Sequence, residues 1–198
     1  MEVTIKSAKE LSEVEIKKIL SAWGVNDWMN LSTEEFQAKF QNSKFYLLYD
    51  NKELGAILRI NYDFEFQVKE IMFQIPELVG FVSLVQSKGY GKHLIQFLRH
   101  DMIAKDTECI GFCYAHNRGF YQKSEIEVLE DKAKFFYESI EEEVIPSDDD
   151  DILNINLKPE TISLLKVLDD NNMAMIIQKE RNHQTSNSCI TNHPTKKN

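Results

Sequence analysis

The pattern of apolar and polar residues changes its period several times along the chain, and each period predicts a different kind of element. Apolar side chains recur at helical spacing over Val14–Trp23, which predicts a helix. Ser12–Glu15 fits the S-x-x-E capping box at the start of that helix, and Gly24 can end it. A second S-x-x-E, Ser32–Glu35, predicts another helix. Val3–Lys6 alternates weakly and precedes both helices as a short strand.

A period of two and short apolar runs mark the strands. Lys44–Asp50 and Leu54–Tyr62 are rich in strand-forming residues and are separated by turn residues, so they predict a hairpin. The nearly continuous apolar run Leu78–Val85 predicts a central strand that is covered on both faces. Cys109–Tyr114 predicts another buried strand, and Asp151–Leu157 alternates cleanly between polar and apolar residues.

The remaining segments complete a mixed order of helices and strands. Helical spacing predicts a helix around Leu94, Ile95, Leu98 and Ile103, a short helix near Asn117–Lys123 and a last helix from Pro159 to about Leu168. Extended character marks Phe64–Gln74, Ile126–Tyr137 and Met173–Gln178. The order β-α-α-β-β-β-turn-α-β-α-β-β predicts one mixed α/β domain over residues 1–180, with an added C-terminal helix. We expect the polar residues 181–198 to form a disordered tail.

Composition narrows the class of protein. The chain has 198 residues, of which 42% are hydrophobic and 28% charged, as expected of a globular domain. The net charge is −9, and residues 141–151 hold seven acids and no bases, so the rest of the chain carries a net charge of only −2. The sequence has no stripe of Lys and Arg, which argues against nucleic acid or an anionic membrane surface as a partner.

Three features of the sequence bear on location. No apolar run approaches the ~20 residues that a membrane span needs. The first ten residues lack the apolar region of a secretory signal. The three cysteines, Cys109, Cys113 and Cys189, cannot form a disulfide framework. We therefore expect a cytoplasmic protein that does not associate with membranes.

The turn Gln86–Lys92, which joins the predicted strand Leu78–Val85 to a helix, is the sharpest local feature. Gly89 and Gly91 allow the backbone to approach a ligand closely. The amides of residues 87–92 lie at a helix N-terminus, where the macrodipole favours an anion such as phosphate or pyrophosphate. The turn lacks the first glycine and the hydroxyl of a P-loop and the third glycine of a dinucleotide fingerprint. A strand-to-helix turn without a ligand is the alternative.

The same turn carries a resemblance to a known family. Gln86–Gly91 has the pattern Q/R-x-x-G-x-G/A and resembles the coenzyme A loop of the GNAT N-acetyltransferases. Phe120–Lys123 is similar to the family's F-Y-x-K, and the predicted element order is similar to the family's from about residue 3 to residue 157. The resemblance implies a mixed, mostly antiparallel central sheet flanked by helices, a GNAT-like acyl-CoA N-acyltransferase fold. It also implies an N-acetyltransferase that uses acetyl-CoA as co-substrate and needs no metal.

In that family the cofactor lies between two central strands that splay apart, which here are Leu78–Val85 and Cys109–Tyr114. The resemblance implies that backbone groups of the first strand pair with the pantetheine amides and that the loop amides hold the pyrophosphate. One polar side chain at the short helix would orient cofactor amides or cap that helix. The residues assigned to the cofactor in this way are Phe81, Val82, Ser83, Gln86, Ser87, Lys88, Gly89, Tyr90, Gly91, Lys92 and Asn117.

The resemblance also assigns an acid and a base. Tyr121, the tyrosine of F-Y-x-K, would protonate the leaving thiolate of coenzyme A, and packing of its ring on the helix is the alternative. Glu77 would act as the base, since strand alternation puts it on the same face as Val79 and Phe81. A solvated strand end is the alternative for Glu77. Weaker candidates for the base are Glu70 and His116.

Two positions depart from the family pattern. Ser83 stands where a proline usually precedes the loop, and Glu125 replaces the glycine that follows F-Y-x-K. Because glycine normally takes the left-handed conformation there, Glu125 predicts a different exit from the helix. These departures leave open a module that binds coenzyme A or acyl-CoA without catalysis.

The leading interpretation of the function is acetylation of a primary amine of a small molecule, and acetylation of protein amines is a further alternative. If Ile126–Tyr137 and Asp151–Leu157 are the last two strands, residues 138–150 form a loop near the acceptor entrance. The negative charge of that loop would attract a cationic amine. A solvated loop that only adds solubility is the alternative. The sequence leaves open the acceptor, the acyl-chain length and the oligomeric state, a dimer included.

Overall fold

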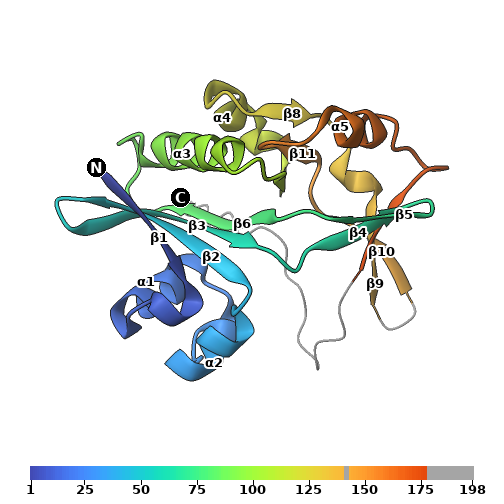
Figure 1. The fold of residues 1–198 in the computed structure, drawn as a ribbon. Helices are drawn as coiled ribbons and strands as arrows, with labels where there is room; N and C mark the ends of the chain where they lie inside the picture. Colours follow the sequence, from blue (N-terminus) through green and yellow to red (C-terminus); the bar gives the residue numbers. More distant parts are fainter. Residues whose placement is uncertain (141–142, 178–198) are drawn as a thin grey trace, which may run out of the picture.

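The structure, a computed structural model, describes residues 1–140 and 143–177. It contains two sheets, with helices on both sides of the larger one (Figure 1). The larger sheet has the strand order β1-β2-β3-β6-β7-β11-β8. Its strands are β1 (Glu2–Ser7), β2 (Ser43–Asp50), β3 (Glu53–Asn61), β6 (Glu77–Ser83), β7 (Ile110–Cys113), β11 (Asp151–Asn154) and β8 (Glu127–Leu129). Its neighbouring strands are antiparallel except β6 and β7, so the predicted mostly antiparallel sheet is confirmed.

The smaller sheet, β10-β9-β12-β4-β5, is built from segments that the sequence leaves hard to place. The single extended segment predicted over residues 126–137 is wrong, because β8 and β9 lie in different sheets. Residues 138–150 are likewise not one loop, since they include β10 and part of β9. The expected tail 181–198 lies outside the described residues. The strands are β4 (Glu65–Val68), β5 (Ile71–Gln74), β9 (Phe136–Ile140), β10 (Glu143–Pro146) and β12 (Ala174–Ile176).

Helices α1 (Glu13–Trp23) and α2 (Thr33–Lys39) lie on one side of the larger sheet, and α3 (Tyr90–Ala104), α4 (Arg118–Lys123) and α5 (Pro159–Lys166) on the other (Figure 1). Both capping boxes are confirmed: Ser12 Oγ accepts from the Glu15 amide at 3.3 Å, and Ser32 Oγ accepts from the Glu35 amide at 3.2 Å. Gly24 ends α1 with a φ of 64°. Short 3-10 helices occur at Ala8–Glu10, Asn26–Trp28, Ala115–Asn117 and Ala133–Phe135. None of the helices described spans enough apolar residues to cross a bilayer.

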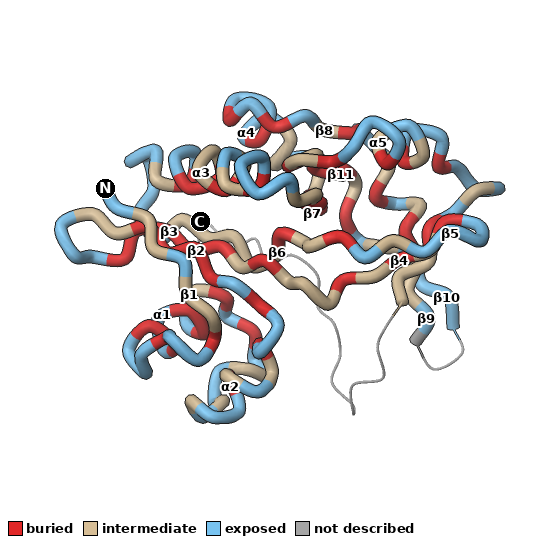
Figure 2. Tube along the Cα trace, viewed as in Figure 1, coloured by how far each residue is buried: buried red, intermediate tan, exposed pale blue. Residues whose placement is uncertain are grey.

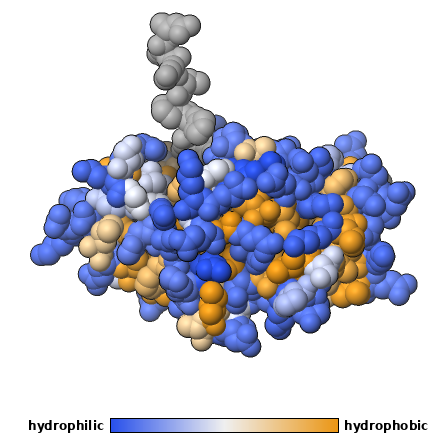
Figure 3. Space-filling view, turned by 90° about the horizontal axis from the view of Figure 1, so that it is seen from above, coloured by the Kyte–Doolittle hydropathy of each residue, from blue (hydrophilic) through white to orange (hydrophobic). Residues whose placement is uncertain are grey.

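Three groups of buried side chains join these layers, and Figure 2 shows them along the inner sides of the sheet and helices. The α3 core includes Leu58, Leu78, Leu94, Leu98, Cys113, Tyr121 and Leu153. The α1 core includes Ile16, Trp23, Phe36, Phe40, Phe45 and Ile57. The second-sheet core includes Phe64, Phe66, Ile110, Phe112, Phe136 and Leu165. Seen from the side of α3, α4 and α5, the surface is mainly hydrophilic, with hydrophobic residues exposed near its middle (Figure 3).

One expectation about burial is wrong, and one residue that marks a predicted helix lies outside its buried stripe. The strand expected over Leu78–Val85 to be covered on both faces is half-buried over most of its length, and Leu84 and Val85 are exposed beyond its end. In α3, Ile103 is 48% exposed, and the neighbouring Met102 is buried instead. The inner stripe of that helix passes through Leu98 and Met102, four residues apart, so position 103 falls outside it.

A β-bulge at Gly80 interrupts β6. Between the pairs Arg59–Val79 and Ile57–Val82, one residue of β3 lies opposite two residues of β6. Gly80 has a φ of 59°, and its carbonyl oxygen accepts a hydrogen bond from Trp23 Nε1 at 2.8 Å. The indole of α1 thereby holds the bulge against the sheet.

The bulge changes which face of β6 each side chain takes. Leu78 and Phe81, three residues apart, both pack against the α3 core, whereas strict alternation would separate them. Glu77, next to Leu78, lies on the other face. The prediction that Glu77 and Phe81 share one face is therefore wrong.

We expect Gly80→Ala to lower the free energy of unfolding by about 1–3 kcal/mol, because a side chain there is strained at positive φ. A Cβ atom at Gly80 would also lie 2.7 Å from Trp23 Nε1. Urea unfolding measures the change. Gly119→Ala is the matched control, since a Cβ at Gly119 meets nothing within 4 Å. Equal stability of the two variants would contradict a role for the bulge.

Candidate active site

The parallel strands β6 and β7 pair only where they begin. Glu77 lies opposite Ile110 and Leu78 opposite Gly111. Beyond these pairs, Val79–Ser83 have no partner strand on that edge among the described residues, although their other edge is bonded to β3. Backbone groups of Val79–Ser83 thus face an opening between the two strands, at the place that the resemblance in sequence implies for the cofactor.

The loop after β6 lies at the head of this opening and is exposed from Leu84 to Gly89. Ser87 and Gly89 take left-handed conformations, with φ values of 60° and 74°. Gly89 occupies the N-cap position of α3, where no side chain caps the helix. The first amides of α3 are therefore available to an anion, and Lys88 and Lys92 are exposed beside them.

Tyr90, one of the residues assigned to the cofactor, anchors the start of α3. Its hydroxyl donates to Asp50 Oδ2 at 2.7 Å. Its ring covers Gly55 in β3, where a Cβ atom would come within 2.6 Å of the ring. The side chain of Tyr90 thus fastens the loop to the β2–β3 hairpin, and only its backbone remains for a ligand.

Three aromatic rings meet where β6 faces α4. The ring centroid of Phe81 is 5.8 Å from that of Phe120 and 6.4 Å from that of Tyr121. Gly91 completes the contact, since a Cβ there would lie 3.4 Å from the rings of Phe81 and Phe120. Tyr121 is 7% exposed. The fold therefore brings Tyr121 from α4 next to the unpaired part of β6 and the first turn of α3.

The exit from α4 keeps the geometry that a glycine would give. Glu125 itself takes the left-handed conformation, with a φ of 65°. The amide of Ile126 then donates to the carbonyl oxygen of Tyr121 at 3.0 Å. The prediction that Glu125 changes the helix exit is therefore wrong.

The other candidates lie in different settings. Asn117 is at the N-cap of α4, but its side chain makes no capping hydrogen bond. His116 is exposed and stacks on Tyr114, with ring centroids 5.5 Å apart. Glu70 is exposed in the turn between β4 and β5 of the smaller sheet. Ser83 Oγ donates to the carbonyl oxygen of Val85 at 3.0 Å.

Glu77 is next to Leu78 of the α3 core and so lies on the opposite face of the larger sheet, where Arg59 contacts the α1 core. Its carboxylate accepts a hydrogen bond from Asn61 Nδ2 at 3.4 Å. Burial raises the pKa of Glu77 to about 7, against the opposing effects of Arg59 and Asn61, and the charges of Asp149 and Glu138 add to the rise. Such a pKa suits a group that exchanges protons at neutral pH.

Comparison with known proteins finds no matching family model and no matching curated protein. Solved structures do match. Escherichia coli ElaA has a TM-score of 0.50 at 14% identity, covering 77% of this chain and 98% of that chain. A Bacillus subtilis acetyltransferase in complex with CoA has a TM-score of 0.49 at 17% identity, covering 79% and 99%. A Streptococcus pneumoniae acetyltransferase of the GNAT family has a TM-score of 0.46 at 17% identity, covering 77% and 96%.

The chain has the GNAT fold. At 14–17% sequence identity, the similarity to these solved structures shows the fold and nothing more. The predicted fold class is thereby confirmed. Within the GNAT fold, the structure brings together the Gln86–Lys92 loop, the unpaired part of β6 and Tyr121, whereas Glu70 lies between β4 and β5 of the smaller sheet.

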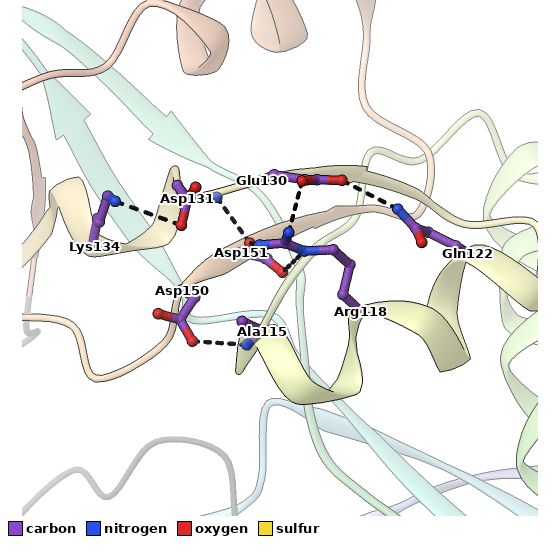
Figure 4. A network of polar contacts seen from close by, with 8 residues as sticks. All are labelled: Ala115, Arg118, Gln122, Glu130, Asp131, Lys134, Asp150 and Asp151. Atoms are coloured by element: carbon purple, nitrogen blue, oxygen red, sulfur yellow. Dashed lines mark hydrogen bonds and ion pairs between the residues drawn. The ribbon is translucent and has the colours of Figure 1, made fainter.

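The acidic segment of this GNAT fold is not one solvated run. Asp151 is fully buried and accepts two hydrogen bonds of 2.7 Å from Arg118 of α4, and Asp150 accepts from the Ala115 amide at 2.7 Å (Figure 4). Arg118 also bonds Glu130 at 2.7 Å. Burial raises the pKa of Asp149 to about 7. The alternative of a solvated loop that only adds solubility is therefore wrong for this part of the segment.

Sequence reasoning misses two residues that shape the site. Gly80 carries a signal that could have been used, because an isolated glycine within a strand pattern indicates a bulge. No signal in the sequence marks Asp149, because it stands among three identical neighbours, Asp148, Asp150 and Asp151. Among the described residues, no group of His, Cys, Asp or Glu is arranged to hold a metal ion.

We expect coenzyme A to raise the melting temperature, and Gly89→Val and Gly91→Val each to remove that rise. A side chain is strained at the φ of Gly89, and one at Gly91 would fill the space between Phe81 and Phe120. Differential scanning fluorimetry measures the shift. Gly119→Val, which changes an exposed glycine of α4, is the control and should keep the rise in melting temperature. Normal coenzyme A binding by either loop variant would mean that the pyrophosphate lies elsewhere.

Proposed function

We propose that this protein is an acetyl-CoA-dependent N-acetyltransferase that acts on a primary amine of a small molecule. The observation that carries the proposal is the opening between β6 and β7, with an uncapped helix N-terminus at its head and Tyr121 beside it. An assay for free thiol, with acetyl-CoA and a panel of amines, tests it directly.

The residues around the opening fit coenzyme A. Exposed amides at a helix N-terminus suit a pyrophosphate, and the left-handed residues Ser87 and Gly89 keep side chains away from them. The edge of β6 at Phe81, Val82 and Ser83 has no partner strand in the part of the chain that the structure describes. It suits the two amides of pantetheine, which would extend the sheet as a strand does. Acetyl-CoA supplies an activated thioester whose leaving group is a thiol.

Two side chains have roles in the transfer. Glu77 takes a proton from the acceptor ammonium, so that the neutral nitrogen forms a bond to the acyl carbon as the carbon–sulfur bond breaks. The electron pair of the carbon–sulfur bond leaves on sulfur, and the hydroxyl of Tyr121 gives that thiolate a proton. The new amide nitrogen then loses its extra proton, which restores the Tyr121 hydroxyl, and Glu77 releases its proton to solvent. The contact of Tyr121 with Phe81 on β6 supports this placement.

Tyr121→Phe should lower kcat by roughly 10²–10⁴-fold, the usual contribution of a general acid. Coenzyme A affinity should change little, because the ring contacts with Phe81 and Phe120 remain. Steady-state kinetics and calorimetry measure the two effects. Tyr49→Phe, which loses a tyrosine hydroxyl that donates to Glu15 of α1, is the control. Unchanged turnover in Tyr121→Phe would mean that Tyr121 only packs against its neighbours. That result would favour a module that binds coenzyme A without catalysis.

The rate should depend on the ionisation of Glu77. A base with a pKa of about 7 is protonated below that pH, so kcat/KM should rise as the pH increases through 7. Glu77→Gln should remove this rise and leave only the ionisation of the amine at higher pH. Glu70→Gln, at an exposed position, should keep the wild-type profile. A rise near pH 7 that persists in Glu77→Gln would assign the base to another group.

A further inference from the structure

Three carboxylates from distant parts of the chain interact electrostatically. Glu77 begins β6, Glu138 belongs to β9, and Asp149 lies between β10 and β11. The charges of Asp149 and Glu138 act on the ionisation of Glu77, so the three groups are close enough to interact.

Backbone hydrogen bonds fix the position of Asp149. The Ser147 amide donates to the carbonyl oxygen of Phe136 at 2.7 Å, and the Asp149 amide donates to Ser147 Oγ at 3.2 Å. The Asp150 amide donates to the carbonyl oxygen of Cys113 at 3.1 Å. Asp149 is thus held between the start of β9 and the C-terminal end of β7, the end at which β7 has parted from β6.

Asp149 has a buried oxygen that nothing in the described part of the chain satisfies. The residue is 3% exposed, and its Oδ1 atom has no hydrogen-bond partner there. Its neighbours differ, because Asp150 binds the Ala115 amide and Asp151 binds Arg118. A buried carboxylate oxygen without a donor is unfavourable, and a ligand that brings a donor removes this cost.

Within the described residues, Arg59 is the one cation whose charge is found to act on Glu77. Arg59 acts on Glu77, and its guanidinium also lies over the Phe40 ring at 4.8 Å and donates to Ser43 Oγ at 3.2 Å. One guanidinium does not neutralise both Glu77 and Asp149. A cation entering beside β7 would keep both carboxylates in their charged form.

We propose that Asp149 binds an ammonium group of the acceptor that does not react, and that the acceptor is a diamine or polyamine. This inference rests on the proposed function, in which Glu77 takes the proton of the reacting nitrogen. That nitrogen becomes neutral before it attacks, so it no longer balances a buried carboxylate. A second ammonium group stays charged and donates to Asp149 Oδ1 in a charge-assisted hydrogen bond.

The test compares two acceptors of the same length, 1,4-diaminobutane and 4-aminobutan-1-ol, on the full chain. The second group of the alcohol is neutral, so only the diamine places a charge on Asp149. Two measurements are made: the melting temperature with coenzyme A and each amine, and kcat/KM for thiol release from acetyl-CoA. The variants are Asp149→Asn and Asp149→Ala, with Asp148→Asn as the matched control, because Asp148 is exposed.

The wild type should favour the diamine by roughly 10- to 100-fold in kcat/KM, as a charge-assisted hydrogen bond predicts. Asp148→Asn should keep the preference, and both Asp149 variants should lose most of it. The diamine should also raise the melting temperature of the wild type more than that of the Asp149 variants.

The outcomes separate the two proposals. If neither amine releases thiol, the proposed function is wrong, and the melting temperatures still decide whether Asp149 binds the diamine. If the wild type has no preference in binding, or if the preference survives in Asp149→Asn, the role of Asp149 is overturned. If Asp148→Asn loses the preference equally, the effect is one of overall charge, and the inference is also wrong.

Discussion

The early parting of β6 from β7 is the constraint on which the rest of the site depends. A sheet stays in one piece across such an opening only if each strand is held on its other edge, as β6 is by β3 and β7 by β11. Both of those pairs are antiparallel, whereas the short contact between β6 and β7 is parallel and contributes two residue pairs. The opening therefore leaves β3, β6, β7 and β11 paired with one another, and the unpaired backbone groups of β6 are available to a ligand.

Several carboxylates around this opening stabilise the fold through hydrogen bonds and ion pairs. Asp151, at the start of β11, accepts from the guanidinium of Arg118 and from the amide of Asp131 (Figure 4). Arg118 begins α4, the helix that carries Tyr121, so the ion pair fixes that helix to the sheet. Asp151 is fully buried, so loss of Arg118 would leave a buried charge without its partner. Asp151 thus holds the side of the opening that lies away from β6.

The sequence predicts those features that are set by local chemistry. Both S-x-x-E caps, Gly24 at the end of α1 and the β2–β3 hairpin follow from short patterns whose physics involves neighbouring residues only. The Gln86–Lys92 loop is predictable for the same reason. The pairing of β8 and β9 with different sheets is not, because it depends on contacts between segments far apart in the chain. Asp149 escapes prediction since burial, and not residue type, distinguishes it from Asp148.

Trp23 makes the bulge in β6 visible to spectroscopy. The chain has two tryptophans, and the indole of Trp23 is buried, bonded to the carbonyl oxygen of Gly80 and 5.9 Å from the ring of Trp28. Indole emission responds to the hydrogen bonding and polarity around the ring. A displacement of β6 at Gly80 changes both, so the unlabelled protein carries its own fluorescent report of movement at the opening.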